Sequence, residues 1–159
     1  MEVIRGIDSL STRYIDGRVA LVTSVLAFSF DGVDVVCSPK AMIGRYMLFE
    51  TDGGTIPRAL WSVYNPWGVY LPAYILHDYA WSNSWVRNAL GFSGTNAMLE
   101  SAIKSIGEHL SIRTSADAKI ISSAVNLFGK CIWNNGAKHV DNLNWHYRME
   151  STWRMQVEN

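Results

Sequence analysis

The sequence predicts an α+β fold, in which a small antiparallel β-sheet from the N-terminal third packs against a group of three to five helices. Two observations predict it. Residues 18–37 consist mostly of Val, Leu, Ala, Phe and Thr and are split by a turn dipeptide, whereas apolar residues recur at helical spacing after Pro57. Because the strands precede the helices instead of alternating with them, a parallel α/β arrangement is disfavoured.

Composition sets the size and class of the molecule. The chain has 159 residues, of which 48% are hydrophobic, so we expect one domain spanning 1–159 with a substantial core. The 14 basic and 14 acidic residues give a net charge of zero, which disfavours nucleic acid as a partner. No apolar run reaches the roughly 20 residues of a transmembrane helix. Arg5 and Asp8 also interrupt a signal peptide, so we expect a soluble protein in the cytoplasm where it is made.

The first half of the chain carries the strands and a glycine loop. Residues 1–50 are expected to be mainly β, with a hairpin turn at Asp31-Gly32 and strands at 18–30, 33–37 and 45–50. Residues 51–70 are expected to form a motif loop, followed by a short helix at Arg58–Tyr64 that stops before Pro66. The loop reads Thr51-Asp52-Gly53-Gly54-Thr55-Ile56-Pro57-Arg58, and its paired glycines indicate unusual dihedrals or a close backbone approach.

Residues 71–136 are expected to be helical. Pro72 begins a helix that ends near Asn83, and a loop through Gly91 and Gly94 leads to a helix over 95–110. The next helix is expected to be capped by Thr114-Ser115 with Asp117 and to end before Gly136.

Residues 137–159 lack clean periodicity and are interpreted as a C-terminal docking segment. The chain holds seven Trp and seven Tyr, more than a small core usually accommodates. We therefore expect Trp145 and Trp153 to contact a partner, either another protein or a second copy of the chain.

The pair His77-Asp78 is the strongest candidate for chemistry, because it lies in a predicted helix that is apolar nearly all round. An imidazole can act as a general base on water, and an adjacent carboxylate can hold a hard divalent cation such as calcium. Asn96, on the core face of the next helix, is placed to approach His77 and fix its tautomer. The alternative is purely structural, with His77 a satisfied core residue and Asp78 hydrogen-bonded to the glycine loop.

The motif loop supplies the candidate binding residues. Asp52, with Asp78, could bind the cation, and Gly53 and Gly54 would let the backbone approach it. Arg58 either pairs with one of these carboxylates as a structural clamp, which we favour, or holds an anionic substrate. Trp61 is a candidate pocket residue, although aromatic residues beside a helix pair are more often core.

The linked motifs Thr51–Arg58, Leu60-Trp61, Pro66-Trp67-Gly68 and His77-Asp78-Tyr79 resemble a bacteriophage and prophage family, domain of unknown function 1353. The resemblance covers Tyr46 to about Gly107 and implies a phage origin, not a chemistry. The family usually has Asp where this chain has Asn96. An amide can hold a histidine tautomer, but it cannot stabilise an imidazolium as a carboxylate does.

The His77-Asp78-Tyr79 stretch is also similar to the helical His-Asp motif of calcium-dependent phospholipases, which follows a glycine-rich calcium loop. Here Tyr79 stands one place early, and Asp52-Gly53-Gly54 lacks the full loop pattern. The likeness concerns reaction type alone.

Three functions follow from these features. The chain is expected to be a virion-associated or assembly protein that retains a His-Asp site and docks onto other phage proteins. The first alternative is a small metal-dependent hydrolase that uses His77 as general base, with Asp78 and Asn96 in its site. The second is an inhibitor or ligand-sequestering protein that acts on a host defence. The expected location is the host cytoplasm and, for a structural role, the virion.

Overall fold

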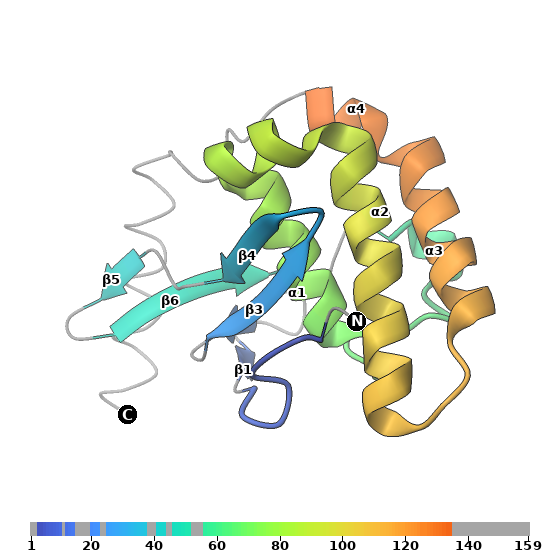
Figure 1. Ribbon diagram of the computed structural model, residues 1–159, viewed down its shortest axis with the longest axis horizontal. Helices are drawn as coiled ribbons and strands as arrows, with labels where there is room; N and C mark the ends of the chain where they lie inside the picture. The colour runs from blue at the N-terminus through green and yellow to red at the C-terminus, as the bar shows by residue number, and fades with distance from the viewer. Residues whose placement is uncertain are drawn as a thin grey trace.

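The computed structural model describes residues 3–10, 12–14, 20–22, 25–37, 41–43, 46–51 and 56–134. The α+β class is confirmed, because the strands of the N-terminal third precede and pack against the helices (Figure 1). No helix among the described residues is long and apolar enough to cross a membrane.

The strands belong to two separate sheets rather than to one. Antiparallel pairing gives a four-stranded sheet in the order β1-β2-β6-β5 and a two-stranded hairpin of β3 and β4. The strands are β1 (Thr12–Tyr14), β2 (Ala20–Val22), β3 (Leu26–Phe30), β4 (Val33–Cys37), β5 (Ala41–Ile43) and β6 (Tyr46–Thr51). The strand predicted over 18–30 therefore contributes to both sheets, since β2 pairs with β6 and β3 pairs with β4.

The β3–β4 hairpin confirms the predicted turn. Asp31 and Gly32 both have positive φ, 49° and 74°, as a two-residue hairpin turn of the mirror-image type I geometry requires. The register pairs Phe30 with Val33, and Leu26, Phe28 and Val35 turn their side chains into the core.

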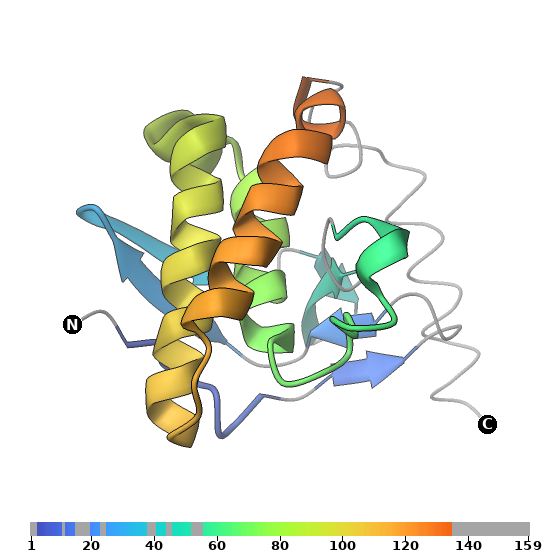
Figure 2. The same ribbon diagram turned by 90° about the vertical axis from the view of Figure 1, so that its right-hand side faces the viewer.

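The helices follow the order η1 (Arg58–Leu60), α1 (Leu71–Ser82), α2 (Ser84–Leu110), α3 (Ser115–Phe128) and α4 (Lys130–Asn134). Helix α1 lies between the hairpin and α2, and α3 packs on the far side of α2 (Figures 1 and 2). The short helix predicted at Arg58–Tyr64 is a single 3-10 turn.

Where a loop through Gly91 and Gly94 is predicted, the structure has a kink at Gly91 alone. Helix α2 already begins at Ser84, because the Asn83 side chain accepts a hydrogen bond from the Val86 N–H and caps it. Gly94 is helical, and Gly91 alone leaves helical dihedrals, with φ 66° and ψ 179°. That conformation is accessible essentially only to glycine, so Gly91 forms the kink at which two helical segments of α2 meet.

The start and end of α3 also differ from expectation. Thr114 is the N-cap residue but makes no side-chain capping bond, and Asp117 accepts hydrogen bonds from the hydroxyls of Tyr64 and Tyr70. The helix ends at Phe128 instead of near Gly136, and the short α4 follows after Gly129.

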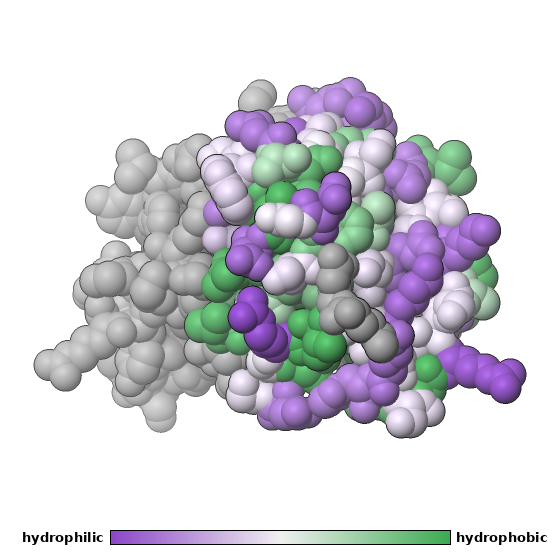
Figure 3. Space-filling model, in the orientation of Figure 1, coloured by the Kyte–Doolittle hydropathy of each residue, from purple (hydrophilic) through white to green (hydrophobic). Residues whose placement is uncertain are grey.

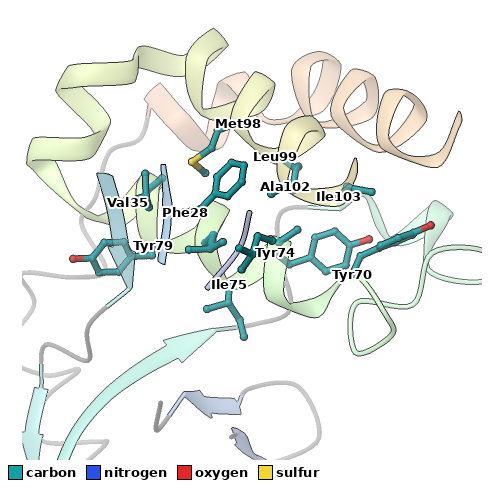
Figure 4. Close-up of a cluster of buried hydrophobic side chains, with 14 of the residues drawn as sticks. Phe28, Val35, Tyr70, Tyr74, Ile75, Tyr79, Met98, Leu99, Ala102 and Ile103 are labelled. Atoms are coloured by element: carbon teal, nitrogen blue, oxygen red, sulfur yellow. The ribbon is translucent and has the colours of Figure 1, made fainter. Parts of the chain in front are cut away.

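The core lies between the hairpin and the helices, with α1 in the middle of it (Figure 4). The largest of the almost completely inaccessible side chains come from β3, α1, α2 and α3: Tyr74, Phe28, Leu26, Ile75, Leu76, Met98, Leu99, Ile103, Ile106 and Ile121. Apolar side chains also reach the surface, and green patches appear at the edge of the molecule where α3 lies (Figure 3).

A buried tyrosine offers a test of this packing. Tyr74 Oη has no hydrogen-bond partner among the described residues, although the side chain is 1% exposed. Tyr74→Phe removes that unsatisfied hydroxyl, so we expect it to raise the unfolding free energy by up to about 1 kcal/mol. Tyr70→Phe, the matched control, loses the bond to Asp117 and is expected to lower it by about 1 kcal/mol. Urea unfolding measures both, and a clearly destabilised Tyr74→Phe variant would contradict the packing.

Candidate functional site

Helix α1 carries the site because it is buried on nearly every side. Pro72 occupies its first turn, where the missing N–H costs no intrahelical bond. All of its residues are buried except Asp78 and Ser82. The hairpin packs on one side of the helix and α2 on the other, so a buried polar side chain such as His77 is stabilised by a partner from a neighbouring element.

His77 obtains its partner from α2. The side chain is 1% exposed, and its Nε2–H donates to Oδ1 of the fully buried Asn96 at 2.9 Å. Asn96 Nδ2 in turn donates to Oδ1 of Asn126 on α3 at 2.8 Å. The expected approach of Asn96 to His77 is confirmed, and the hydrogen bonds extend through a third residue to form a chain across three helices.

Burial decides the protonation state of His77. Removal from water lowers the pKa of His77 to about 4, and the hydrogen bond to Asn96 opposes this shift only in part. The imidazole is therefore neutral at pH 7. Because Nε2 carries the proton that Asn96 accepts, Nδ1 carries the lone pair. The site thus holds an imidazole in one tautomer with its basic nitrogen defined.

An aromatic wall lies one turn after His77. The Trp81 ring centroid is 4.7 Å from that of His77, and Trp81 Nε1–H donates to Thr95 Oγ1 at 3.0 Å. Trp81 also packs against Phe92 and Trp133. This cluster keeps the surroundings of the imidazole apolar, which is the physical cause of its lowered pKa.

Asp78 faces a different neighbour. The Asp78 side chain is half-buried. The pKa of the Cys37 thiol is raised to about 12, first by the burial of Cys37 and then by the negative charge of Asp78. Asp78 therefore lies near the end of β4, whereas His77 faces α2. The geometry brings His77 together with Asn96, and Asp78 together with Cys37.

The candidate binding residues of the motif loop lie only in part within the described ranges. Asp52, Gly53 and Gly54 lie outside them, as do Trp145 and Trp153. The Arg58 guanidinium lies 5.7 Å from the centroid of the Trp61 ring, and Trp61 Nε1–H donates to the Ile56 carbonyl. Among the described residues no ion pair joins Arg58 to Asp78, and Asp52, the other predicted partner of Arg58, lies outside them, so the clamp stays a prediction.

A calcium site is not complete in the described part of the chain. Calcium takes about six to eight oxygen ligands, several of them carboxylates. Within those ranges, no group of three or more His, Cys, Asp or Glu residues could hold a metal ion. Asp78 would supply one carboxylate there, so these residues alone do not fit the cation, and no chemical step below depends on it.

Two site residues were not identified from sequence. Asn126 had a weak signal, because it is a polar residue among apolar ones and follows the polar Ser122 by four positions, about one helical turn. Cys37 ends an apolar strand and gave no sign that it would lie close to Asp78. Both proximities depend on long-range packing that periodicity does not encode.

The fold and site define an α+β protein with a buried histidine held by an amide. A family model described as "Protein of unknown function (DUF1353)" matches residues 36–118, just over half of the chain, and the chain belongs to that family. The matched region includes His77, Asp78 and Asn96 and ends before Asn126. No curated protein and no solved structure matches the chain.

The low pKa of His77 makes stability depend on pH. A free histidine has a pKa of 6.5, and folding lowers that of His77 to about 4. Between these values the unfolded chain binds a proton that the folded chain does not. The contribution of His77 to stability is therefore complete above pH 6.5 and decreases as the pH is lowered towards 4. The loss approaches about 3 kcal/mol near pH 4.

Urea unfolding at pH 7, 5.5 and 4.5 measures this dependence. His77→Gln should flatten the part of the curve that lies below pH 6.5, because the glutamine does not titrate. The surface variant His109→Gln is the matched control. If it flattens the curve and His77→Gln does not, the assignment to His77 is wrong.

Proposed function

We propose that the chain is a hydrolase of carboxylic esters in which His77 acts as the general base. The observation that carries the proposal is the hydrogen bond from His77 Nε2–H to Asn96 Oδ1, which leaves Nδ1 as the basic nitrogen. A base held in one tautomer by a second residue is the arrangement that hydrolysis by activated water requires. The likeness to phospholipase motifs, which concerns reaction type, supports hydrolysis of an ester as the reaction.

His77 would move one proton in each half of the reaction. Nδ1 takes a proton from water, and the resulting hydroxide attacks the ester carbonyl carbon to form a tetrahedral intermediate. When the intermediate collapses, the bond to the alcohol oxygen breaks, and the leaving alkoxide receives the proton from Nδ1. The histidine ends the cycle neutral, as it began.

Asn96 positions the ring but limits the rate. Its carbonyl oxygen holds Nε2–H, yet a neutral amide stabilises the transient imidazolium less than a carboxylate does. His77 is 1% exposed, so water and ester reach Nδ1 only when neighbouring segments move. Both properties predict slow turnover in the wild-type chain.

Activity variants test the roles of His77 and Asn96. We expect His77→Ala to abolish hydrolysis of short-chain p-nitrophenyl esters and phosphatidylcholine vesicles, because the base is lost. Asn96→Asp is expected to raise turnover by roughly tenfold or more, because the carboxylate stabilises the imidazolium. His109→Ala, at a surface histidine, should leave the rate unchanged.

The assays are run with calcium and with a chelator, which shows whether a cation contributes. The acid limb of the rate profile should lie near the pKa of His77, about 4, in the wild-type chain and move to higher pH in Asn96→Asp. The hydrolase proposal is refuted if His77→Ala turns over as fast as the wild type. It is also refuted if neither the wild type nor Asn96→Asp shows any turnover.

A second candidate function is assembly of a phage particle, with the phage origin resting on the family resemblance. Apolar side chains at the end of α3 and on α4 support it: Leu127, Phe128 and Ile132 are 76%, 65% and 56% exposed. They precede the segment 137–159 that contains Trp145 and Trp153. The partner would be another protein of the same particle.

Mass spectrometry of purified particles tests the assembly role, since the chain should then copurify with them in fixed proportion. Replacement of Leu127 and Phe128 by Ser should reduce that amount several-fold while leaving thermal stability nearly unchanged, because both side chains are exposed. Ser123→Ala, at another exposed position of α3, is the control. Free protein in infected cells with none in particles would exclude this role.

A further inference from the structure

Asn126 connects the buried histidine to the surface. It lies on the last two turns of α3 and is exposed, while its Oδ1 accepts the hydrogen bond from Asn96 Nδ2. Asn96 is fully buried and contacts His77 with its other amide atom. The two hydrogen bonds therefore use both ends of one side-chain amide, one facing α1 and the other facing α3.

The orientation of this amide determines which nitrogen of His77 is basic. With Oδ1 of Asn96 towards His77, Nε2 must carry a proton and Nδ1 keeps the lone pair. With the amide reversed, Nδ2 would donate to Nε2, and the proton of the neutral ring would move to Nδ1. The reversed amide would thus remove the lone pair from the nitrogen that the proposed reaction uses.

An acceptor on α3 selects the first orientation. Asn126 presents Oδ1 to Asn96 at 2.8 Å, and an oxygen there can bond only the N–H end of the Asn96 amide. The oxygen of Asn96 is then left to face His77. Among the described residues, these are the two hydrogen-bond partners of the Asn96 side chain, so the orientation of Asn96 depends on Asn126 presenting its oxygen, and not its own N–H group, to Asn96.

We propose that Asn126 is a positioning residue that sets the tautomer of His77 by orienting the amide of Asn96. The proposal deepens the hydrolase and rests on it for its catalytic consequence. Its tautomer consequence holds independently of turnover. A merely structural contact between α2 and α3 would contribute to stability but would leave the proton of His77 where it is.

Three variants separate these possibilities. Asn126→Asp keeps an acceptor and offers no donor, so it should preserve the wild-type amide orientation. Asn126→Ala removes the acceptor and lets the Asn96 amide reverse. Asn88→Ala, at an exposed position early in α2, is the matched control for loss of a surface asparagine.

Long-range nitrogen–proton NMR correlations of the His77 ring at pH 7 report which nitrogen carries the proton. We expect Nε2–H in the wild type, Asn126→Asp and Asn88→Ala, and a substantial Nδ1–H population in Asn126→Ala. Ester turnover should fall roughly fivefold in Asn126→Ala with KM little changed, which is the scale of one hydrogen bond, and Asn126→Asp should retain it.

The tautomer tests the positioning role of Asn126, and the turnover tests the hydrolase, so each proposal can be overturned without the other. A wild-type tautomer in Asn126→Ala overturns the positioning role, whatever the turnover. A shifted tautomer without hydrolysis in any variant confirms the positioning role and refutes the hydrolase. A proton on Nδ1 of His77 in Asn126→Asp also overturns the proposal, because an acceptor at position 126 would then not select the orientation of the Asn96 amide.

Discussion

The structure depends on the burial of α1 from both sides. A polar side chain that is buried between the hairpin and α2 loses its contact with water, so a hydrogen-bond partner on one of those elements stabilises it. His77 and Trp81 both have such a partner on α2, Asn96 and Thr95 respectively. These two bonds lie one helical turn apart on α1 and join it to adjacent residues of α2, so they hold the two helices together beside His77.

The end of the helical layer depends on contacts of the same two helices. Gly91 kinks α2, and beyond the kink Phe92 joins Trp81 and Trp133 in one aromatic cluster. The Arg87 guanidinium lies 3.6 Å from the Trp133 ring centroid, which attaches the short α4 to α2. Helix α4 is too short to be stable alone, so its position comes from these contacts.

Local patterns predicted what depends on local geometry. Asp31-Gly32 adopts the turn that its residue types favour, and the helical spacing of Asn96 placed its side chain on the face towards His77. The division of the strands into two sheets and the contact of Asn126 depend on which distant segments meet, and periodicity does not encode that. Gly94 misled for another reason: glycine lowers helix propensity by about 1 kcal/mol, which the packing and capping of α2 can override.

At position 96, the side chain that best suits the stability of the core differs from the one that would best assist catalysis by His77. A buried carboxylate beside His77 would form a charged pair, whose desolvation can exceed the attraction between its members. An asparagine replaces that pair by a neutral chain that continues to Asn126 and leaves both ends of its amide hydrogen-bonded. The neutral chain suits a core that excludes water, but it gives the imidazolium no counter-charge. The amide at position 96 thus favours a well-packed interior. A carboxylate there would improve catalysis by stabilising the imidazolium, but it is the group whose burial in this interior costs most.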